Sequence, residues 1–197
     1  YKRQDHNLVD LLESGKVDGW QLAGICEYPL EKTGNPISRI WQRWFAHPKR
    51  VAKEINRLVS NNQCDLVHIT DQEHGHLMPK NCPVPGTITV HDLFHIFPEH
   101  LRFSDEIIAV GNTNPGIVRR RDLQKLKAGI NRANHLLCNS KHTLEAAEQH
   151  FPTVAASRVP LGIESAKYHP ENNQPIKLDL PDKCNFCLLY TSPSPRD

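Results

Sequence analysis

The chain has 197 residues, enough for one domain or slightly more and enough to bury an apolar core without disulfides. Its 24 Lys and Arg against 22 Asp and Glu give a net charge of +2, so no nucleic-acid partner held mainly by phosphate contacts is predicted. No stretch approaches the roughly 18 apolar residues of a membrane-spanning helix. Six scattered Cys are typical of reduced thiols, and we expect a soluble, cytoplasmic α/β or mixed protein.

Both ends of the sequence are unusual. The first residue is Tyr1 and the single Met is Met78, so we expect that an N-terminal part is lacking. Residues 187–197 resemble a translated reading frame of a transposase-type sequencing adapter, so we exclude them from fold reasoning and expect their deletion to leave folding unchanged. One Cys of the C-x-x-C pair Cys184 and Cys187 belongs to that tail, and no second pair has suitable spacing, so no zinc site is predicted there.

The first third of the chain is predicted to be mainly helical. Apolar residues at helical spacing indicate helices near 8–12, over 37–45 and from Pro48 onward. Between them, the apolar run at 20–28 predicts a strand, and the Pro, Gly and Asn of 29–36 predict a loop.

From residue 65 onward, short apolar runs alternate with helical patterns. Strands are predicted at 65–70, 86–90, 135–138 and 158–163, and helices at 116–133 and 141–150, the latter capped by Ser140. This alternation predicts an α/β fold, with a Rossmann-like parallel sheet flanked by helices.

Polar side chains follow three of these strands, at the ends where parallel sheets bind ligands. The three sets are Asp71, His74 and His76 after 65–70; His91 and Asp92 after 86–90; and Ser140 and Thr143 after 135–138. Such groups suit hydroxyls and phosphates, and three sets on one sheet edge favour a cleft. The alternative is ordinary turn chemistry, because Asp, Asn and Ser favour strand-to-helix turns without any ligand.

The twelve His raise the question of a metal site. His91 and His95 are four residues apart, but they lack the Glu of an H-E-x-x-H motif, and Pro98 disfavours a continuing helix. His74 and His76 are two apart, and no metal site is predicted from either pair. P-loop, dinucleotide-binding and nucleophile-elbow motifs are absent from the sequence.

The predicted helix at 116–133 is strongly basic. Its cations are Arg119, Arg120, Arg121, Lys125, Lys127 and Arg132. One interpretation is a peripheral contact with anionic lipid head groups at the inner face of the membrane, or with a lipid-phosphate acceptor. The other interpretation is a solvated helix face.

Several segments between residues 65 and 170 resemble family 4 glycosyltransferases in consistent order. They are D-L-V-H-I-T-D (65–71), P-G-T-I-T-V-H-D-L (85–93), F-P-E (97–99), R-A-N-H-L-L-C-N-S-K-H-T (132–143), R-V-P-L-G-I-E (158–164) and Y-H-P (168–170). Glu164 and Tyr168 stand where that family commonly has Asp and Phe.

The resemblance implies the incomplete N-terminal half of a GT-B architecture, which has two Rossmann-like domains facing a cleft. Residues 1–163 would form the acceptor-side domain without its first strand and Gly-rich loop, and 164–186 would begin the interdomain linker and the C-terminal domain. The implied activity is retaining transfer of a sugar from a nucleotide-sugar co-substrate to an unknown saccharide or lipid-linked hydroxyl acceptor, without a cofactor. We expect this chain alone to be inactive, because the family's donor contacts lie in the other domain.

The resemblance also implies that His91, in the H-D-L segment, is the catalytic-site histidine on the acceptor side. We expect acceptor binding by the polar residues at the first two strand ends, with a helix N-terminus completing the cleft. The acceptor-binding set is Asp71, His74, His76 and Asp92, and the helix N-terminus contributes Ser140 and Thr143. Two alternatives remain: a non-catalytic α/β binding domain that uses the same cleft, and, less favoured, a metal-dependent hydrolase built on the His residues.

Overall fold

The computed structural model describes residues 2–27, 35–103 and 106–162. The chain divides into two units, Tyr1–Leu161 and Gly162–Asp197, and the helices and strands that the structure describes lie in the first. The predictions for the interdomain linker and the adapter-like tail lie outside the described residues.

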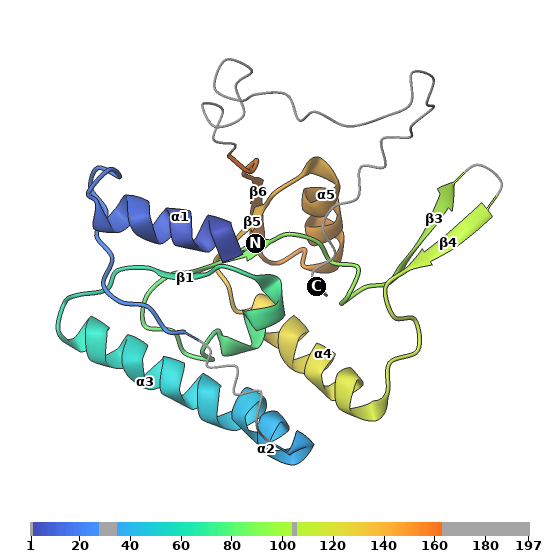
Figure 1. Ribbon diagram of the computed structural model, residues 1–197, viewed down its shortest axis with the longest axis horizontal. Helices are drawn as coiled ribbons and strands as arrows, with labels where there is room; N and C mark the ends of the chain where they lie inside the picture. Colours follow the sequence, from blue (N-terminus) through green and yellow to red (C-terminus); the bar gives the residue numbers. More distant parts are fainter. Residues whose placement is uncertain (1, 28–34, 104–105, 163–197) are drawn as a thin grey trace, which may run out of the picture. The chain divides into compact units, whose positions relative to one another are not determined.

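Helical segments precede the first strand, as predicted (Figure 1). They are α1 (Lys2–Glu13), α2 (Pro36–Trp41) and α3 (His47–Ser60), and the π-helix η1 (Gln42–Ala46) joins α2 to α3 without a break. The Asn35 side chain caps α2 by accepting a 2.8 Å hydrogen bond from the Ser38 N–H. The first helix is followed by an irregular segment rather than a strand.

The strand predicted at 20–28 is wrong over its described part. Residues 20–27 adopt no regular structure, and both Trp20 and Ile25 are exposed. A strand needs a neighbour for its backbone N–H and C=O groups, and none of the described strands pairs with this segment. The apolar run therefore lacks the tertiary contact on which strand formation depends.

Four strands form one parallel sheet in the order β1-β2-β5-β6: β1 (Val67–Ile69), β2 (Gly86–Val90), β5 (His135–Cys138) and β6 (Ala155–Arg158). This confirms the predicted α/β class with a parallel, Rossmann-like sheet. The last strand lies earlier than the predicted 158–163 and overlaps it only at Arg158. Along the sheet, the strands follow one another in chain order, so the strand order does not reverse within the described sheet. Parallel sheets bind ligands beyond the carboxyl ends of their strands, so this edge is the candidate site.

The connections between these strands carry the remaining helices. The 3₁₀ helix η2 (Gln72–Leu77) follows β1, α4 (Ile117–Ile130) precedes β5, and α5 (Lys141–His150) follows β5. The predictions of α4 and α5 are confirmed. An unpredicted hairpin, β3 (Glu99–Phe103) and β4 (Glu106–Val110), pairs antiparallel and stands apart from the parallel sheet among the described strands. Across the described chain, no helix combines the length and apolar character that a membrane span requires.

Alternation along the strands separates a buried face of the sheet from a polar one. The buried face packs against α4, α5 and the segment that follows α5, and its core residues are Ile88, Val90, Leu126, Ile130, Leu136, Cys138, Ala147 and Phe151. On the opposite face, the His68 ring bridges two partly exposed threonines, with Nδ1 2.8 Å from Thr87 Oγ1 and Nε2 3.2 Å from Thr89 Oγ1. The helices therefore anchor one face of this sheet.

Two glycines allow η2 to pack directly on α4. A Cβ atom on Gly129 would overlap the Gly75 carbonyl oxygen and would lie 2.9 Å from His76 Cα. A Cβ on Gly75 would lie 2.8 Å from Ile130 Cγ1. The absence of both side chains lets the two backbones touch, which fixes the segment after β1 against the core.

Candidate functional site

The ends of β1, β2 and β5 bring polar residues together at the carboxyl edge of the sheet (Figure 1). We refer to Asp71, Gln72, His91, Asp92, Ser140 and Thr143 as the strand-end cluster. His91 lies at its centre: its backbone N–H donates to Gln72 Oε1 at 2.9 Å, and its carbonyl oxygen accepts from Thr143 Oγ1 at 3.2 Å. One residue thus links the segments after all three strands.

The His91 ring is more enclosed than its place after a strand suggested. The residue is 6% exposed, and Nε2 lies 3.2 Å from the carbonyl oxygen of Thr70. A carbonyl oxygen can only accept, so this hydrogen bond places a proton on Nε2. His91 does lie at the predicted edge, but it is held there by both its backbone and its ring.

Asp92 is the half-buried carboxylate of the cluster. Its Oδ1 is shielded from solvent and makes no hydrogen bond with any other residue that the structure describes. Burial raises the pKa of the Asp92 carboxyl; the charge of His95 and a hydrogen bond from the Phe94 backbone oppose this shift, whereas the negative charges of Asp71 and Glu73 add to it. A carboxyl oxygen without a donor can accept a hydrogen bond from a ligand hydroxyl.

Two members of the cluster also have capping roles. Ser140 Oγ accepts from the Thr143 backbone N–H at 3.1 Å and caps α5, as the sequence predicted. The Asp71 carboxylate accepts from the Glu73 backbone N–H at 2.7 Å and caps η2. The turn-chemistry alternative therefore accounts for Ser140, for Asp71 and for the Phe94 backbone contact of Asp92, but not for the shielded Oδ1 of Asp92.

The two histidines of η2 lie on another side of the segment. His76 is 6% exposed, and neither ring nitrogen makes a hydrogen bond with another described residue. Burial, together with the nearby charge of Arg43, lowers the pKa of His76 to about 3, so the ring is neutral near pH 7. The half-buried His74 ring lies 6.5 Å from it and electrostatically affects His47. The structure thus places His76 in the interior rather than with His91 and Asp92.

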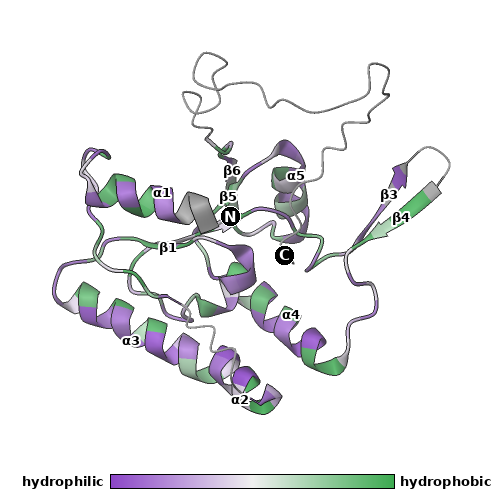
Figure 2. Ribbon diagram, in the orientation of Figure 1, coloured by the Kyte–Doolittle hydropathy of each residue, from purple (hydrophilic) through white to green (hydrophobic). Residues whose placement is uncertain are grey.

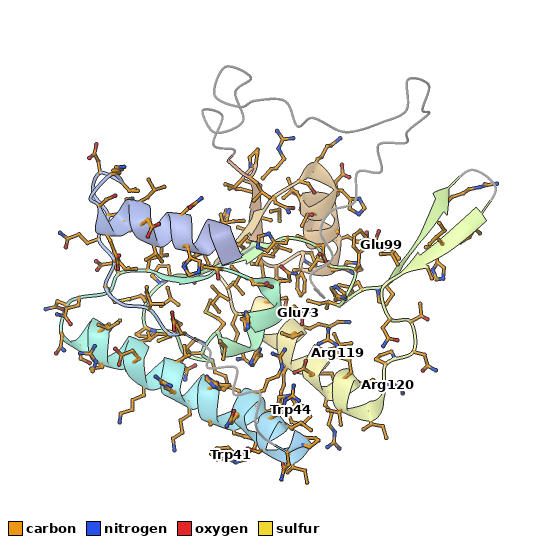
Figure 3. All side chains as sticks on the ribbon, in the orientation of Figure 1. Trp41, Trp44, Glu73, Glu99, Arg119 and Arg120 are labelled. Carbon is orange, nitrogen blue, oxygen red and sulfur yellow. The ribbon has the colours of Figure 1, made fainter. Side chains whose placement is uncertain are left out.

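A charged network that the sequence did not reveal joins η1, η2 and α4; we call Arg43, Trp44, Glu73, Arg119 and Asp122 the ion-pair junction (Figure 3). Arg43 binds Asp122 through Nε at 2.7 Å and Nη2 at 3.1 Å, and its Nη2 also donates to the Glu73 carbonyl at 3.1 Å. Arg119 Nη1 lies 2.9 Å from Asp122 Oδ2, while its Nη2 lies 3.2 Å from Glu73 Oε1. Trp44 Nε1 donates to Asp122 Oδ1 at 3.0 Å.

Asp122 is the centre of this junction. Although burial alone would raise its pKa, hydrogen bonds from Arg43 and Trp44 and the positive charges of Arg43 and Arg119 hold that pKa below its ordinary value. A buried carboxylate that accepts four hydrogen bonds is well satisfied. Only the i,i+3 spacing of Arg119 and Asp122 was visible in the sequence; the other partners are 30 to 79 residues apart.

Most cations of the predicted basic helix contact groups within the fold. Besides Arg119, the contacts are Arg120 Nε to the Pro115 carbonyl at 2.8 Å, Arg132 Nη1 to the Met78 carbonyl at 2.8 Å, Lys125 Nζ 5.2 Å from the Phe45 ring centre, and Lys127 Nζ 4.0 Å from the Phe97 ring centre. The helix is therefore not a simple solvated row of charges.

Within the described part of the chain, no three His, Cys, Asp or Glu side chains gather in a way that could hold a metal ion. Comparison of the chain with protein-family models, with curated proteins and with solved structures finds no match. The fold and the site define an α/β protein with a four-stranded parallel sheet and a polar cluster at its carboxyl edge.

Proposed function

We propose that this chain is the acceptor-side domain of a retaining glycosyltransferase of the GT-B type. The observation that carries the proposal is the convergence of His91, Asp92 and Thr143 at one sheet edge. These residues belong to the H-D-L and N-S-K-H-T segments that resemble family 4 glycosyltransferases. The acceptor is a hydroxyl-bearing saccharide or lipid-linked molecule, and the donor is a nucleotide sugar.

The chemistry that this domain supplies is positioning of the acceptor hydroxyl. Transfer needs that hydroxyl to be oriented toward the anomeric carbon, and a fixed hydrogen-bond acceptor contributes to the orientation. Asp92 Oδ1 is the unsatisfied acceptor at the edge. The raised pKa of the Asp92 carboxyl makes this group a better proton acceptor than an ordinary aspartate.

His91 keeps this acceptor site in place. Its three hydrogen bonds, to Gln72, Thr70 and Thr143, hold the backbone that carries Asp92. A ring held in this way loses little conformational freedom when an acceptor binds, which favours orientation of the bound hydroxyl. The resemblance assigns the same ring a place beside the transferred sugar.

The test uses NMR to measure the binding of simple glycosides and of lipid-linked saccharides to the full chain. The wild-type chain should bind one class of acceptor, and Asp92→Ala and His91→Gln should each weaken that binding about tenfold, the loss of one good hydrogen bond. His135→Gln is the matched control, because His135 begins β5 and lies at the amino edge of the sheet. Equal binding by all four proteins would contradict the proposal.

A non-catalytic α/β binding domain is the second candidate, and the burial of His91 favours it. In such a domain the imidazole serves stability alone. His91→Gln would then lower the unfolding midpoint while acceptor binding stayed as in the wild type. Reconstituted sugar transfer with a donor-binding domain, abolished by Asp92→Asn, would instead support the transferase.

A further inference from the structure

We propose that the face formed by α2, η1 and the start of α4 binds an anionic membrane surface. Ile37, Trp41 and Phe45 recur every four residues along α2 and η1, and all three are exposed. Ile117 and Val118, at the start of α4, are exposed as well. Ile37 is 77% exposed and Ile117 is 75% exposed, which is unusual for side chains of this size. We call these five residues the apolar face.

An open depression of about 510 Å³ lies between η1 and the start of α4, and of the five residues of the apolar face it is lined by Ile117 and Val118. Ile40 and Trp44 line it from α2 and η1, and Ile117 and Val118 line it from α4. Beneath it lies the ion-pair junction, in which Arg43 and Asp122 tie η1 to α4. Figure 3 shows Trp41 and Trp44 on the α2 side and Arg119 and Arg120 on the α4 side of this region. The face is therefore preformed rather than assembled from mobile loops.

The charge of these elements indicates the sign of the partner. Residues 35–60, which form α2, η1 and the adjoining α3, and residues 116–132 around α4 hold twelve of the 24 Lys and Arg but only two of the 22 Asp and Glu, a net charge of +10. The other residues hold 12 cations and 20 acids, a net charge of −8, so the small overall charge hides a strong asymmetry. Of the exposed cations, Arg39 lies on α2 and Arg121 on α4. A partner with negative charge fits this side of the molecule.

Apolar side chains and cations on the same elements favour a lipid surface over other anionic partners. Ile, Val and Phe gain nothing from contact with phosphates alone, whereas they enter the boundary between head groups and acyl chains. Trp is enriched at that boundary because its ring is apolar and its N–H is polar. Figure 2 shows hydrophobic and hydrophilic residues interleaved along α2 and α4, so that cations lie close to the exposed apolar side chains. The inference does not depend on the proposed function.

The test uses the full chain and two vesicle types, phosphatidylcholine alone and equal parts phosphatidylcholine and phosphatidylglycerol. The chain should sediment with the mixed vesicles, with a blue-shifted Trp emission, and should bind at least about tenfold more weakly to neutral vesicles or at high salt. Trp41→Ser and Ile117→Ser should each weaken binding to the mixed vesicles several-fold. Trp20→Ser and Ile107→Ser are matched controls, since Trp20 is 55% and Trp41 59% exposed and Ile107 lies on β4.

Several results would overturn the proposal. Binding to both vesicle types alike, or equal losses for Trp41→Ser and Trp20→Ser, would exclude a specific anionic-lipid face. Self-association that Trp41→Ser abolishes, without vesicle binding, would make the face a protein interface instead. Tighter binding to RNA than to vesicles, unchanged in Trp41→Ser, would indicate a nucleic-acid contact. Should an apolar variant fail to fold, Arg39→Gln with Arg121→Gln, compared with Lys16→Gln, tests the same face through its charge.

Discussion

The strand-end cluster and the ion-pair junction both include residues of η2 or its cap, yet they are built differently. Around His91, the hydrogen bonds join side chains mainly to backbone groups, and every member of the cluster lies within a few residues of a strand end. Around Asp122, charged side chains bond to one another, and they come from three separate elements. Local chain geometry produces the first region, whereas tertiary packing produces the second.

The two regions also differ in how completely their polar atoms are satisfied. Asp122 accepts four hydrogen bonds, whereas Asp92 keeps a shielded oxygen that bonds to no other described residue. A fully satisfied buried network rigidifies a fold, and an unsatisfied acceptor needs a further partner. We therefore assign the ion-pair junction to stability and the strand-end cluster to ligand binding, and the predictions below test that division.

The largest loss of stability is expected at the contact between η2 and α4, on which both regions depend. Gly129→Ala would place a methyl group against the Gly75 carbonyl and within 2.9 Å of His76 Cα, so η2 must move away from α4. Overpacking of this kind should cost about 3 kcal/mol of unfolding free energy or more, measured by urea denaturation. Gly24→Ala is the control, since its Cβ would meet only Leu58 Cδ1 at 3.6 Å. Unchanged stability of Gly129→Ala would show that the contact is looser than the structure has it.

Removal of the central carboxylate should destabilise the protein by a somewhat smaller amount. Asp122→Ala leaves the donors of Arg43 and Trp44 without their acceptor; because both partner guanidinium groups are partly exposed, we expect about 2–3 kcal/mol. The folded pKa of Asp122 lies below its ordinary value of 3.8, so its contribution is present above that value and is lost as the pH falls through the folded pKa. Glu54→Ala, which breaks an exposed pair with Arg57, is the control and should change stability little.

The sequence predicted the parts of the fold in which local pattern and tertiary contact agree. The bounds of β2, β5 and α5 were predicted because each has a period, a cap or flanking turn residues of its own. The last strand was misplaced because 155–157 holds only Ala and Ser, which pair with β5 by position rather than by propensity. The hairpin β3–β4 was missed because its apolar residues, such as Ile107, remain exposed.

The same contrast applies to the candidate site. His91 and Asp92 could be placed at the sheet edge because the residue after a parallel strand has a predictable position. Arg43 and Asp122 are 79 residues apart, and only packing of η1 on α4 reveals that they meet. The burial of His76 was hidden for the same reason, because it depends on the glycine contact between η2 and α4.

The pH dependence of stability should distinguish His76 from the histidines at the surface. Its folded pKa of about 3 lies below the ordinary 6.5, so the unfolded chain binds more protons between these values and stability falls as the pH falls through this window. Between pH 7 and pH 5, the free energy of unfolding measured by urea denaturation should therefore fall by about 2 kcal/mol less in His76→Leu than in the wild type. His100→Leu, at an exposed position of β3, should keep the wild-type profile. Parallel profiles for wild type and His76→Leu would mean that folding does not shift the pKa of His76.

The smallest effect tests the division between the two regions most directly. Thr143→Val keeps the volume of a buried side chain but removes the hydroxyl that lies within hydrogen-bond distance of the His91 carbonyl, Asn139 Oδ1 and Ser140 Oγ. The Ser140 cap on the Thr143 N–H stays. The loss of the hydroxyl's hydrogen bonds should cost about 1–1.5 kcal/mol, and the exposed Thr153→Val should cost nothing measurable. If the strand-end cluster binds the acceptor, Thr143→Val should also weaken that binding by about threefold to tenfold at a temperature where both proteins are fully folded, because the backbone that carries Asp92 is no longer held.

Asp122→Ala, studied below its own unfolding transition, should bind the acceptor as the wild type does, since the hydrogen bonds of Asp122 join η1 to α4 and not the strand ends. Weaker acceptor binding in Asp122→Ala than in Thr143→Val would reverse the assignment and make the junction the more important support of the site.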